Sequence, residues 1–256
     1  MPTLAFTNQK GGVGKTTSAV NVAAELARAG NPTLLVDLDP QGNASSGLGI
    51  RDRSRGTYEL LIEGTPVAEL AQESFVEGLS VLPGTADLAG AEVELAEAEG
   101  RYVRLARALT EHHFTYVIID CPPALGFLSI NALVAARYVV IPVQCEYYAL
   151  EGLSRLFEIL RKVKRSLNPE LELLGVVITM YDKRVRLSDS VVSEVRKHFP
   201  QQTFETIVPR NVRLAEAPSY GEPIGSFDKR SSGARAYRKL AEEIHAAVQP
   251  RAWQRA

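Results

Sequence analysis

Short apolar runs recur along the chain, each four to eight residues long, and two of them run directly into aspartate residues. Continuous apolar runs of this length are typical of strands that are buried on both faces of a parallel sheet. They predict strands at 4–7, 33–38, 79–83, 116–120, 138–143, 173–180 and 206–209.

Between these runs, apolar residues return every three or four positions, which indicates helices with one buried face. This spacing predicts helices at 17–29, 86–109, 129–136, 150–166, 188–198 and 233–248, with shorter helical stretches near 57–62 and 67–72. The remainder of the Gly- and Ser-rich segment 40–60 is expected to be loop.

Strands and helices alternate throughout, which favours an α/β fold with a mostly parallel central sheet and helices on both faces. No linker, repeat or low-complexity segment interrupts the pattern, so we expect a single domain over residues 1–256. An α/β barrel is the alternative, but it needs eight regular strand–helix units that the pattern does not supply. Hydrophobic residues make up 45% of the chain, which is enough for a large core, and no apolar run is long enough to cross a membrane.

The strongest motif lies between the first predicted strand and the first predicted helix. In that setting, a glycine-rich loop turns its backbone N–H groups towards a phosphate, and the helix N-terminus adds positive potential. Lys15 would reach the β- and γ-phosphates, and the Thr16 hydroxyl would bind Mg²⁺. A glycine-rich turn that only caps a helix is the alternative. The predicted cofactor-binding residues here are Gly11, Gly12, Val13, Gly14, Lys15, Thr16 and Thr17.

The motif departs from the standard P-loop pattern, because Gln9 stands where the first glycine belongs and Lys10 precedes the shifted glycines. Lys-Gly-Gly-Val-Gly-Lys-Thr-Thr resembles the deviant Walker A motif of the ParA/MinD family of P-loop ATPases. The resemblance implies a P-loop NTPase fold, with ATP and Mg²⁺ as cofactors. It also implies that Lys10 reaches across a nucleotide-sandwich homodimer to the partner's phosphates, as the family's signature lysine does.

Aspartates follow two of the predicted strands. Asp37 and Asp39 alternate along one strand, so both should face the nucleotide at the carboxyl edge of the sheet, unless one of them caps the turn before Pro40. Asp120 ends another strand, as a Walker B acid does, and would hold Mg²⁺ directly or through water; a strand-ending turn former is the alternative. The resemblance makes 36–43 a switch I region in which Asp39 positions the attacking water beside the Mg²⁺ shell. The expected catalytic residues are Lys10, Lys15 and Asp39, and the expected metal ligands are Thr16, Asp39 and Asp120.

The resemblance also places the adenine near the ends of two later strands. Met180 ends one of them, and Pro209 and Asn211 follow another. An asparagine side chain can both donate to and accept from the edge of an adenine. Each of these residues could equally be an ordinary turn residue.

Within this family, three segments look like chromosomal ParA proteins of the Soj type: 39–44, 143–152 and 209–218. A MinD-like membrane ATPase in division-site placement is the alternative, and it would end in a basic amphipathic helix. The last predicted helix contains Glu242 and Glu243, and its apolar stripe favours core packing instead. An iron–sulfur redox ATPase or a small-molecule ligase is less consistent with the chain, since Cys121 and Cys145 show no cluster signature and no substrate pocket is recognisable.

The net charge of −1 would disfavour a nucleic-acid binder, but the charge is unevenly divided. Residues 1–179 carry a net charge of −6 and residues 180–256 a net charge of +5. The basic part is either a solvated face or a surface for phosphates. The resemblance implies a cytoplasmic, nucleoid-associated protein whose ATP-bound homodimer binds double-stranded DNA without sequence preference, and a ParB-like centromere-binding partner that stimulates hydrolysis. Arg184 and Arg213 match basic positions implicated in DNA binding in the family.

Overall fold

The protein is described by a computed structural model that covers residues 1–146 and 151–249. Within these residues, eight strands form one sheet in the order β3-β4-β2-β5-β1-β6-β7-β8. All neighbouring strands are parallel except β3 and β4, so the predicted mostly parallel sheet is confirmed. The strands are β1 (Thr3–Phe6), β2 (Thr33–Asp37), β3 (Gln72–Glu73), β4 (Leu79–Leu82), β5 (Tyr116–Asp120), β6 (Tyr138–Gln144), β7 (Glu172–Tyr181) and β8 (Thr203–Pro209).

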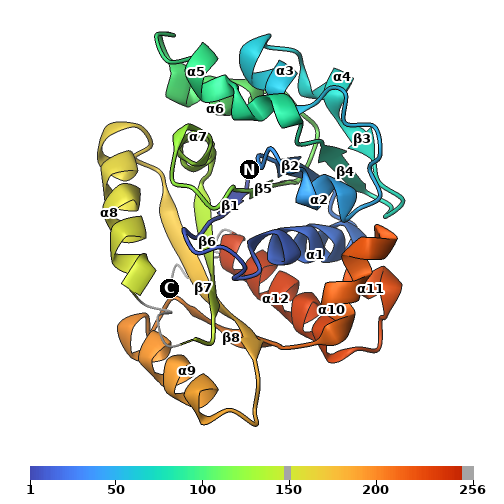
Figure 1. Ribbon diagram of the computed structural model, residues 1–256, viewed down its shortest axis with the longest axis vertical. Coiled ribbons are helices and arrows are strands. Elements are labelled where there is room, and N and C mark those ends of the chain that lie inside the picture. The colour runs from blue at the N-terminus through green and yellow to red at the C-terminus, as the bar shows by residue number, and fades with distance from the viewer. Residues whose placement is uncertain (147–150, 250–256) are drawn as a thin grey trace, which may run out of the picture.

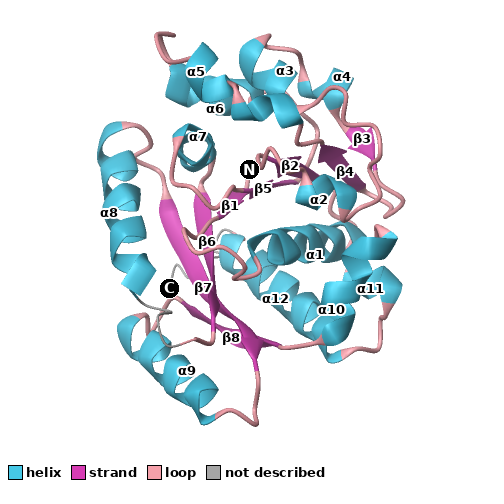
Figure 2. Ribbon diagram, in the orientation of Figure 1, coloured by secondary structure: helices cyan, strands magenta, loops and turns pink. Residues whose placement is uncertain are grey.

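Helices cover both faces of this sheet (Figures 1 and 2), as the alternating pattern predicts. The helix α1 packs beside α12 on one face, while α3, α6, α7 and α8 lie over the other. The longer helices are α1 (Lys15–Arg28), α7 (Phe127–Ala135), α8 (Glu151–Ser166), α9 (Arg186–His198) and α12 (Ser232–Val248). The shorter ones are α2 (Asn43–Ser46), α3 (Thr57–Ile62), α4 (Val67–Leu70), α5 (Ala91–Glu94), α6 (Arg104–Ala108), α10 (Val212–Glu216) and α11 (Ile224–Phe227).

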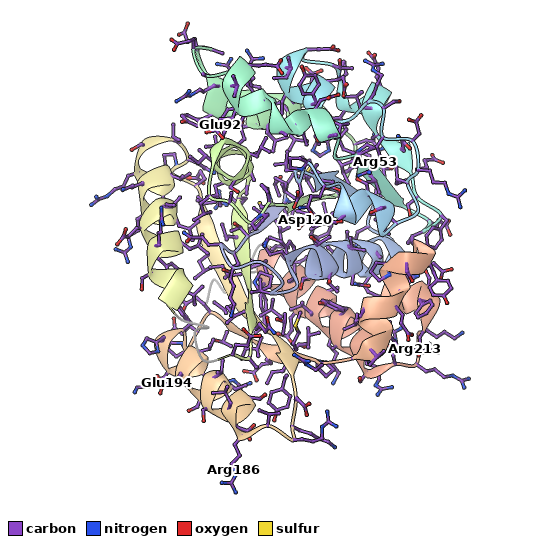
Figure 3. The ribbon with its side chains drawn as sticks, viewed as in Figure 1. Arg53, Glu92, Asp120, Arg186, Glu194 and Arg213 are labelled. Atoms are coloured by element: carbon purple, nitrogen blue, oxygen red, sulfur yellow. The ribbon has the colours of Figure 1, made fainter. Side chains whose placement is uncertain are left out.

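The carboxyl ends of the central strands lie level with one another. Asp120, the last residue of β5, is in register with Phe6 at the end of β1 and with Asp37 at the end of β2. This register brings the loop that follows β1 to the same edge of the sheet as both aspartates. Asp120 consequently lies in the middle of the molecule (Figure 3).

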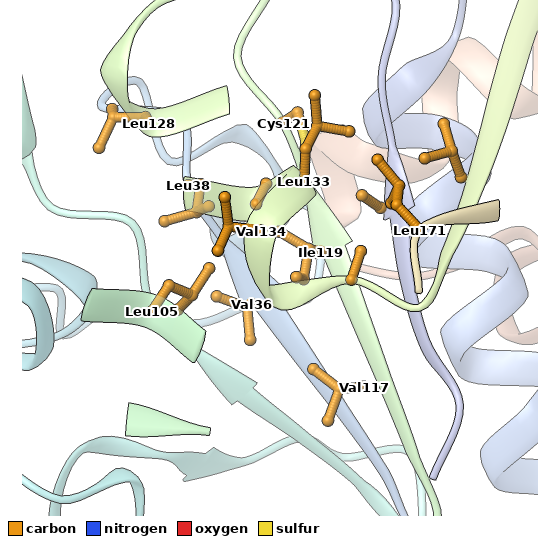
Figure 4. Packing of buried hydrophobic residues seen from close by; sticks show 14 of the residues in the cluster. Val36, Leu38, Leu105, Val117, Ile119, Cys121, Leu128, Leu133, Val134 and Leu171 are labelled. Carbon is orange, nitrogen blue, oxygen red and sulfur yellow. The ribbon is translucent and has the colours of Figure 1, made fainter. Parts of the chain in front are cut away.

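Alternate side chains of the central strands point into two separate cores. Val36 and Ile119 pack with Leu105 and Leu133 against the helices of one face (Figure 4). Their neighbours in sequence, such as Leu35, pack towards α1 and α12 instead. A strand with both faces buried must be apolar throughout, which is why the sheet is readable as continuous apolar runs.

The prediction of a single helix at 86–109 is wrong. Between positions 91 and 100 the chain has no basic residue to offset the mutual repulsion of its glutamates along a helix. Gly100 adopts a left-handed conformation with φ of +67°, which ends any continuous helix there. The segment instead forms the short 3₁₀ turn η1 (Ala86–Ala89), α5, the 3₁₀ turn η2 (Arg101–Val103) and α6.

Other boundaries differ on a smaller scale. The segment 40–60 is not all loop before α3, because it contains α2. The predicted helix 67–72 is shorter than expected: α4 ends at Leu70, and β3 begins at Gln72. The residues between β8 and α12 form α10, the 3₁₀ turn η3 (Ala217–Tyr220) and α11, for which the apolar spacing gives no signal. The predicted helix 150–166 corresponds to α8, and its residue 150 lies outside the described residues.

Candidate nucleotide-binding site

The glycine-rich loop connects the end of β1 to the start of α1. Gly12 and Gly14 have φ of +75° and +87°, a left-handed conformation in which a side chain would be strained. Gly14 is the N-cap of α1 and has no side chain with which to cap the helix. The N–H groups of the first turn therefore face the pocket described below, in the arrangement that binds phosphate.

Buried hydrogen bonds to β6 and β7 hold this loop in place. The Thr179 hydroxyl, near the end of β7, donates a hydrogen bond of 2.8 Å to the Val13 carbonyl. The side-chain amide of Asn8 donates to the Pro142 carbonyl at 2.7 Å. Both bonds are buried and join segments far apart in sequence, so the sheet itself fixes the position of the loop.

Lys15 lies at the start of α1, and its side chain is buried. Its ammonium group donates to the Lys10 carbonyl at 3.3 Å, which is a long hydrogen bond. Burial lowers the pKa of Lys15, while the nearby carboxylates of Asp120 and Asp39 oppose that shift. A buried cation whose main favourable neighbours are two carboxylates is well placed to meet further negative charge.

Asp120 is completely buried at the end of β5, and neither of its carboxylate oxygens has a hydrogen-bond partner among the described residues. Burial, followed by the negative charge of Asp37, raises the pKa of Asp120 well above its usual value, and Thr16 and Lys15 oppose the rise. Unpartnered buried carboxylate oxygens beside a threonine hydroxyl suit Mg²⁺, a hard cation that prefers oxygen ligands.

No cluster of three or more His, Cys, Asp or Glu side chains capable of holding a metal occurs in the described part of the chain. Mg²⁺ usually takes only one or two protein carboxylates and completes its shell with water and substrate phosphates. Thr16 and Asp120 are the groups that would hold it here.

The two aspartates after β2 have different surroundings. Asp37 is fully buried, and its Oδ2 accepts hydrogen bonds from the Ser45 N–H at 2.8 Å and the Ser45 hydroxyl at 2.7 Å. Asp37 therefore anchors α2 to the sheet. Its Oδ1 also accepts from the Asp39 N–H at 3.2 Å, which is the turn-capping role before Pro40 that the sequence leaves open for one of the pair. Asp39 accepts from the Gln41 N–H through Oδ1 at 3.0 Å, and its Oδ2 has no hydrogen bond to the described residues.

A pocket of about 400 Å³ opens above the glycine-rich loop. Gly12, Gly14, the first turn of α1 and residues of α2 line it together with apolar side chains. A pocket that combines phosphate-type backbone donors with apolar contacts fits a nucleotide. Its lining includes Thr17, Asn43, Met180, Leu214, Ala217 and Pro218.

Comparison with known proteins identifies the family. A family model described as an AAA domain matches residues 1–173. The chain is 53% identical over 247 residues to the sporulation initiation inhibitor protein Soj of Bacillus subtilis (strain 168), covering 95% of this chain and 98% of that protein. It is also 53% identical over 246 residues to the chromosome-partitioning ATPase Soj of Thermus thermophilus, covering 96% of each. The chain belongs to the Soj/ParA family of chromosome-partitioning ATPases.

Solved structures agree with this assignment. A structure described as cobyrinic acid a,c-diamide synthase from Mycobacterium smegmatis, with a bound ATP analogue and magnesium, superimposes with a TM-score of 0.83. The two proteins are 36% identical, and the superposition covers 94% of this chain and 93% of the other. A Soj/ParA ATPase uses ATP and Mg²⁺.

Lys10, which the resemblance makes the family's signature lysine, lies outside the pocket lining. Its ammonium group forms an ion pair with Glu146, with 2.5 Å between Nζ and Oε2. The pair is only partly shielded from water, so it contributes little to stability. Lys10 is thus held within its own chain, and the role that the resemblance implies for it stays a prediction.

Of the three predicted adenine contacts, one lines the pocket and two do not. Met180 lines the pocket and has φ of +54°, a strained conformation for a side chain and one that tends to occur at functional sites. Pro209 and Asn211 are not among the lining residues. Asn211 instead caps α10, accepting from the Arg213 N–H at 2.8 Å and donating to the Ser232 hydroxyl at 2.8 Å. Their contact with the base stays a prediction.

The two predicted DNA-binding arginines are exposed, and both are paired with acids. Arg184 binds Asp182 through two hydrogen bonds of 2.9 and 2.7 Å, which holds the pKa of Asp182 below its usual value. Arg213 reaches Glu216 at 2.8 Å and Asp228 at 3.3 Å. Either guanidinium must exchange a carboxylate for a phosphate if it is to bind DNA.

Some residues of the site escaped sequence reasoning. Leu214, Ala217 and Pro218 line the pocket but lie in a segment whose apolar spacing matches no helix or strand. Ser45 and Thr179 position the loops through side-chain hydrogen bonds: the Ser45 hydroxyl donates to Asp37 and accepts from the Gly84 N–H, and the Thr179 hydroxyl donates to the Val13 carbonyl. A lone Ser or Thr carries no sequence signal of such a bond.

Proposed function

We propose that this chain is a DNA-partitioning ATPase in which Mg·ATP joins two copies, the dimer binds DNA without sequence preference, and slow hydrolysis separates the copies. The observation that carries the proposal is Asp120, a buried carboxylate without a hydrogen-bond partner, beside Lys15 and Thr16 at the mouth of a phosphate-binding loop. Leaving such a group unsatisfied costs stability, which is expected where a ligand completes it.

The residues divide the chemistry between them. The loop N–H groups and Lys15 bind the β- and γ-phosphates and neutralise charge that develops during phosphoryl transfer. Thr16 and Asp120 hold Mg²⁺, which supplies further charge neutralisation when bound. Asp39 orients the attacking water through its free Oδ2. Phosphoryl transfer needs little else from the protein, because catalysis rests on positioning and electrostatics.

Dimer formation would engage Lys10. In the monomer its ammonium group pairs with Glu146, and across a dimer it would meet the partner's phosphates instead. The exchange is energetically feasible, since a half-exposed ion pair is weak and a phosphate carries more negative charge than a carboxylate. Loss of the γ-phosphate would return Lys10 to Glu146.

The DNA surface would belong to the basic C-terminal part. Several exposed cations there have no carboxylate within 4.0 Å among residues 1–146 and 151–249, so they can meet phosphate without losing an ion-pair partner. Alignment of two such surfaces in a dimer would raise avidity without new contacts. A ParB-like partner that stimulates hydrolysis, and association with the nucleoid, follow from the same proposal. The cations are Lys183, Arg186, Arg210, Lys229, Arg230, Arg235 and Lys239.

The membrane-bound alternative is not favoured. In α12, Tyr237, Leu240 and Ile244 pack into the core, so the apolar stripe of this helix is not free to meet lipid. Within the described ranges, none of the helices combines the length and apolar character needed to cross a bilayer. The basic tail at 251–255 lies outside the described residues.

Replacing Asp39 with alanine should leave ATP-dependent dimerisation intact and reduce ATP turnover by about 100-fold, because the phosphates keep their ligands while the water loses its orienting carboxylate. Size-exclusion chromatography with ATP and a phosphate-release assay measure the two effects. The exposed Asp87→Asn variant is the control and should behave as wild type. Normal turnover by Asp39→Ala would assign the water to another group.

DNA binding should require ATP and weaken steeply with salt, because each phosphate contact releases a counterion. A titration with ATP, with ADP and without nucleotide, repeated at several salt concentrations, measures this. Loss of one phosphate-binding arginine in Arg213→Ala should reduce the salt slope by about 1 per subunit. Arg161→Ala, an exposed change on α8, should leave it unchanged. Salt-insensitive binding, or ATP-dependent sedimentation with liposomes but not DNA, would contradict the proposal.

A further inference from the structure

Arg53 lies on the loop between α2 and α3, and it reaches back to the turn that carries Asp39. Its Nη1 donates a hydrogen bond of 2.9 Å to the carbonyl of Gln41. The side chain is half-buried, and no carboxylate lies within 4.0 Å of it in the described part of the chain. The guanidinium is therefore committed to backbone, which is unusual for a side chain that could remain in water.

Gly42 leaves the space that this contact needs. A Cβ atom on Gly42 would lie 1.5 Å from Nη1 of Arg53 and 2.9 Å from the Gly84 carbonyl oxygen. Gly42 also has φ of +65°, which favours glycine independently. The guanidinium thus packs directly against the backbone of the turn, where any other residue would displace it.

The turn transmits this contact to Asp39. The Gln41 N–H donates to the Asp39 carboxylate at 3.0 Å, and the Gly42 N–H donates to the Asp39 carbonyl at 2.9 Å. Gln41 is consequently held on both sides, with Asp39 on its N–H and Arg53 on its C=O. Release of the carbonyl would let the Gln41 backbone rotate and would free the Asp39 carboxylate to leave its present rotamer.

The loop that carries Arg53 is itself anchored. The Asp52 carboxylate accepts hydrogen bonds from the Ser54 N–H at 3.0 Å and the Ser54 hydroxyl at 2.7 Å. The Asp52 carbonyl accepts from the Gln72 side chain, at the start of β3, at 2.8 Å. Arg53 therefore projects from a loop fixed to the sheet edge, and it can hold the turn without help from the nucleotide.

We propose that Arg53 is a positioning residue for ATP hydrolysis: through the Gln41 backbone, it holds the Asp39 carboxylate where that group orients the attacking water. The inference rests on the proposed role of Asp39. Arg53 is not among the residues that line the pocket, so its loss should lower the rate of the chemical step and leave the binding of ATP intact.

The test compares steady-state ATP turnover by wild type, Arg53→Ala and Arg53→Lys, with Arg51→Ala as the matched control, an exposed arginine two positions away. Arg53→Ala should lower kcat about tenfold while KM for ATP stays within about twofold, because misplaced catalytic groups cost rate and not binding. Arg53→Lys keeps one donor and should recover part of the loss. Arg51→Ala should keep wild-type constants, and melting temperatures should confirm folding in each case.

A second comparison places Arg53→Ala in an Asp39→Ala background. If Arg53 acts through Asp39, the double variant should turn over no more slowly than Asp39→Ala alone, whereas a further tenfold loss would overturn the inference. Equal kcat for Arg53→Ala and Arg51→Ala would overturn it as well. If Arg53→Ala does not fold, Arg53→Met keeps the aliphatic stem and takes its place. Normal turnover by Asp39→Ala would instead reject the underlying role of Asp39, so the two failures are distinguishable.

Discussion

Replacing Lys15 with alanine should abolish measurable ATP turnover, with a loss of about 100-fold or more in kcat. Lys15 is the buried cation at the first turn of α1, and burial already lowers its pKa while Asp120 and Asp39 hold it charged. Without it, these carboxylates would face the triphosphate with no protein cation between them. Phosphate release and binding of a fluorescent ATP analogue measure the two losses separately.

The fold should survive this change, because the only hydrogen bond that the Lys15 side chain makes to the described residues is the long one to the Lys10 carbonyl. Lys162→Ala, which removes an exposed lysine from α8, is the matched control and should keep full activity. Lys15→Arg should also be inactive, because a guanidinium is larger and cannot occupy the same buried space. Turnover within a few-fold of wild type in Lys15→Ala would mean that the phosphates bind elsewhere.

Those parts of the site that depend on residues close together in the sequence could be predicted from it. The glycine-rich loop needs a strand before it and a helix after it, and both have clear periodic patterns. Asp120 could be placed because a strand-ending acid in a parallel sheet must lie at the carboxyl edge, level with the loop. Local spacing and the geometry of parallel sheets suffice for these residues.

Contacts between distant segments could not be predicted in this way. Lys10 and Glu146 are separated by 136 positions, and nothing in either neighbourhood indicates the pair. The hydrogen bond from Arg53 goes to the backbone carbonyl of Gln41. Every residue has such a carbonyl, so no residue type in the sequence indicates this contact. Asn211 suits both a base contact and a helix cap, and only the folded chain gives it the cap.

The division of charge along the sequence indicates a basic part, but it does not tell which cations are available. Arg184 and Arg213 lie in that part, and each is neutralised by acids that are close in space. Lys183 and Arg210, in contrast, have no such partner in the described ranges. These local ion pairs determine which cations can bind phosphate, and the net charge of a segment does not show them.

Asp120→Asn should stabilise the protein without nucleotide and remove its Mg²⁺-dependent activity. The Asp120 carboxylate is fully buried with no hydrogen-bond partner in the described residues, and burial outweighs the favourable effects of Thr16 and Lys15, so its charge is a net cost until Mg²⁺ arrives. Neutralising it should raise the free energy of unfolding by about 1–3 kcal/mol. Urea unfolding in the presence of a chelator measures the gain, and phosphate release with Mg·ATP measures the loss.

The pH dependence of this gain follows from the raised pKa of Asp120, whose main cause is burial. The folded chain binds the Asp120 proton more tightly than the unfolded chain, so wild type is stabilised at low pH and loses that stability as pH rises above about 4. Asp120→Asn cannot titrate there, and its advantage should be absent in acid and grow towards neutral pH. Asp87→Asn, at an exposed position, should show no advantage at any pH. A variant less stable than wild type at pH 7 would mean that Asp120 has a favourable partner in the free protein, and the case for a cation at this carboxylate would be lost.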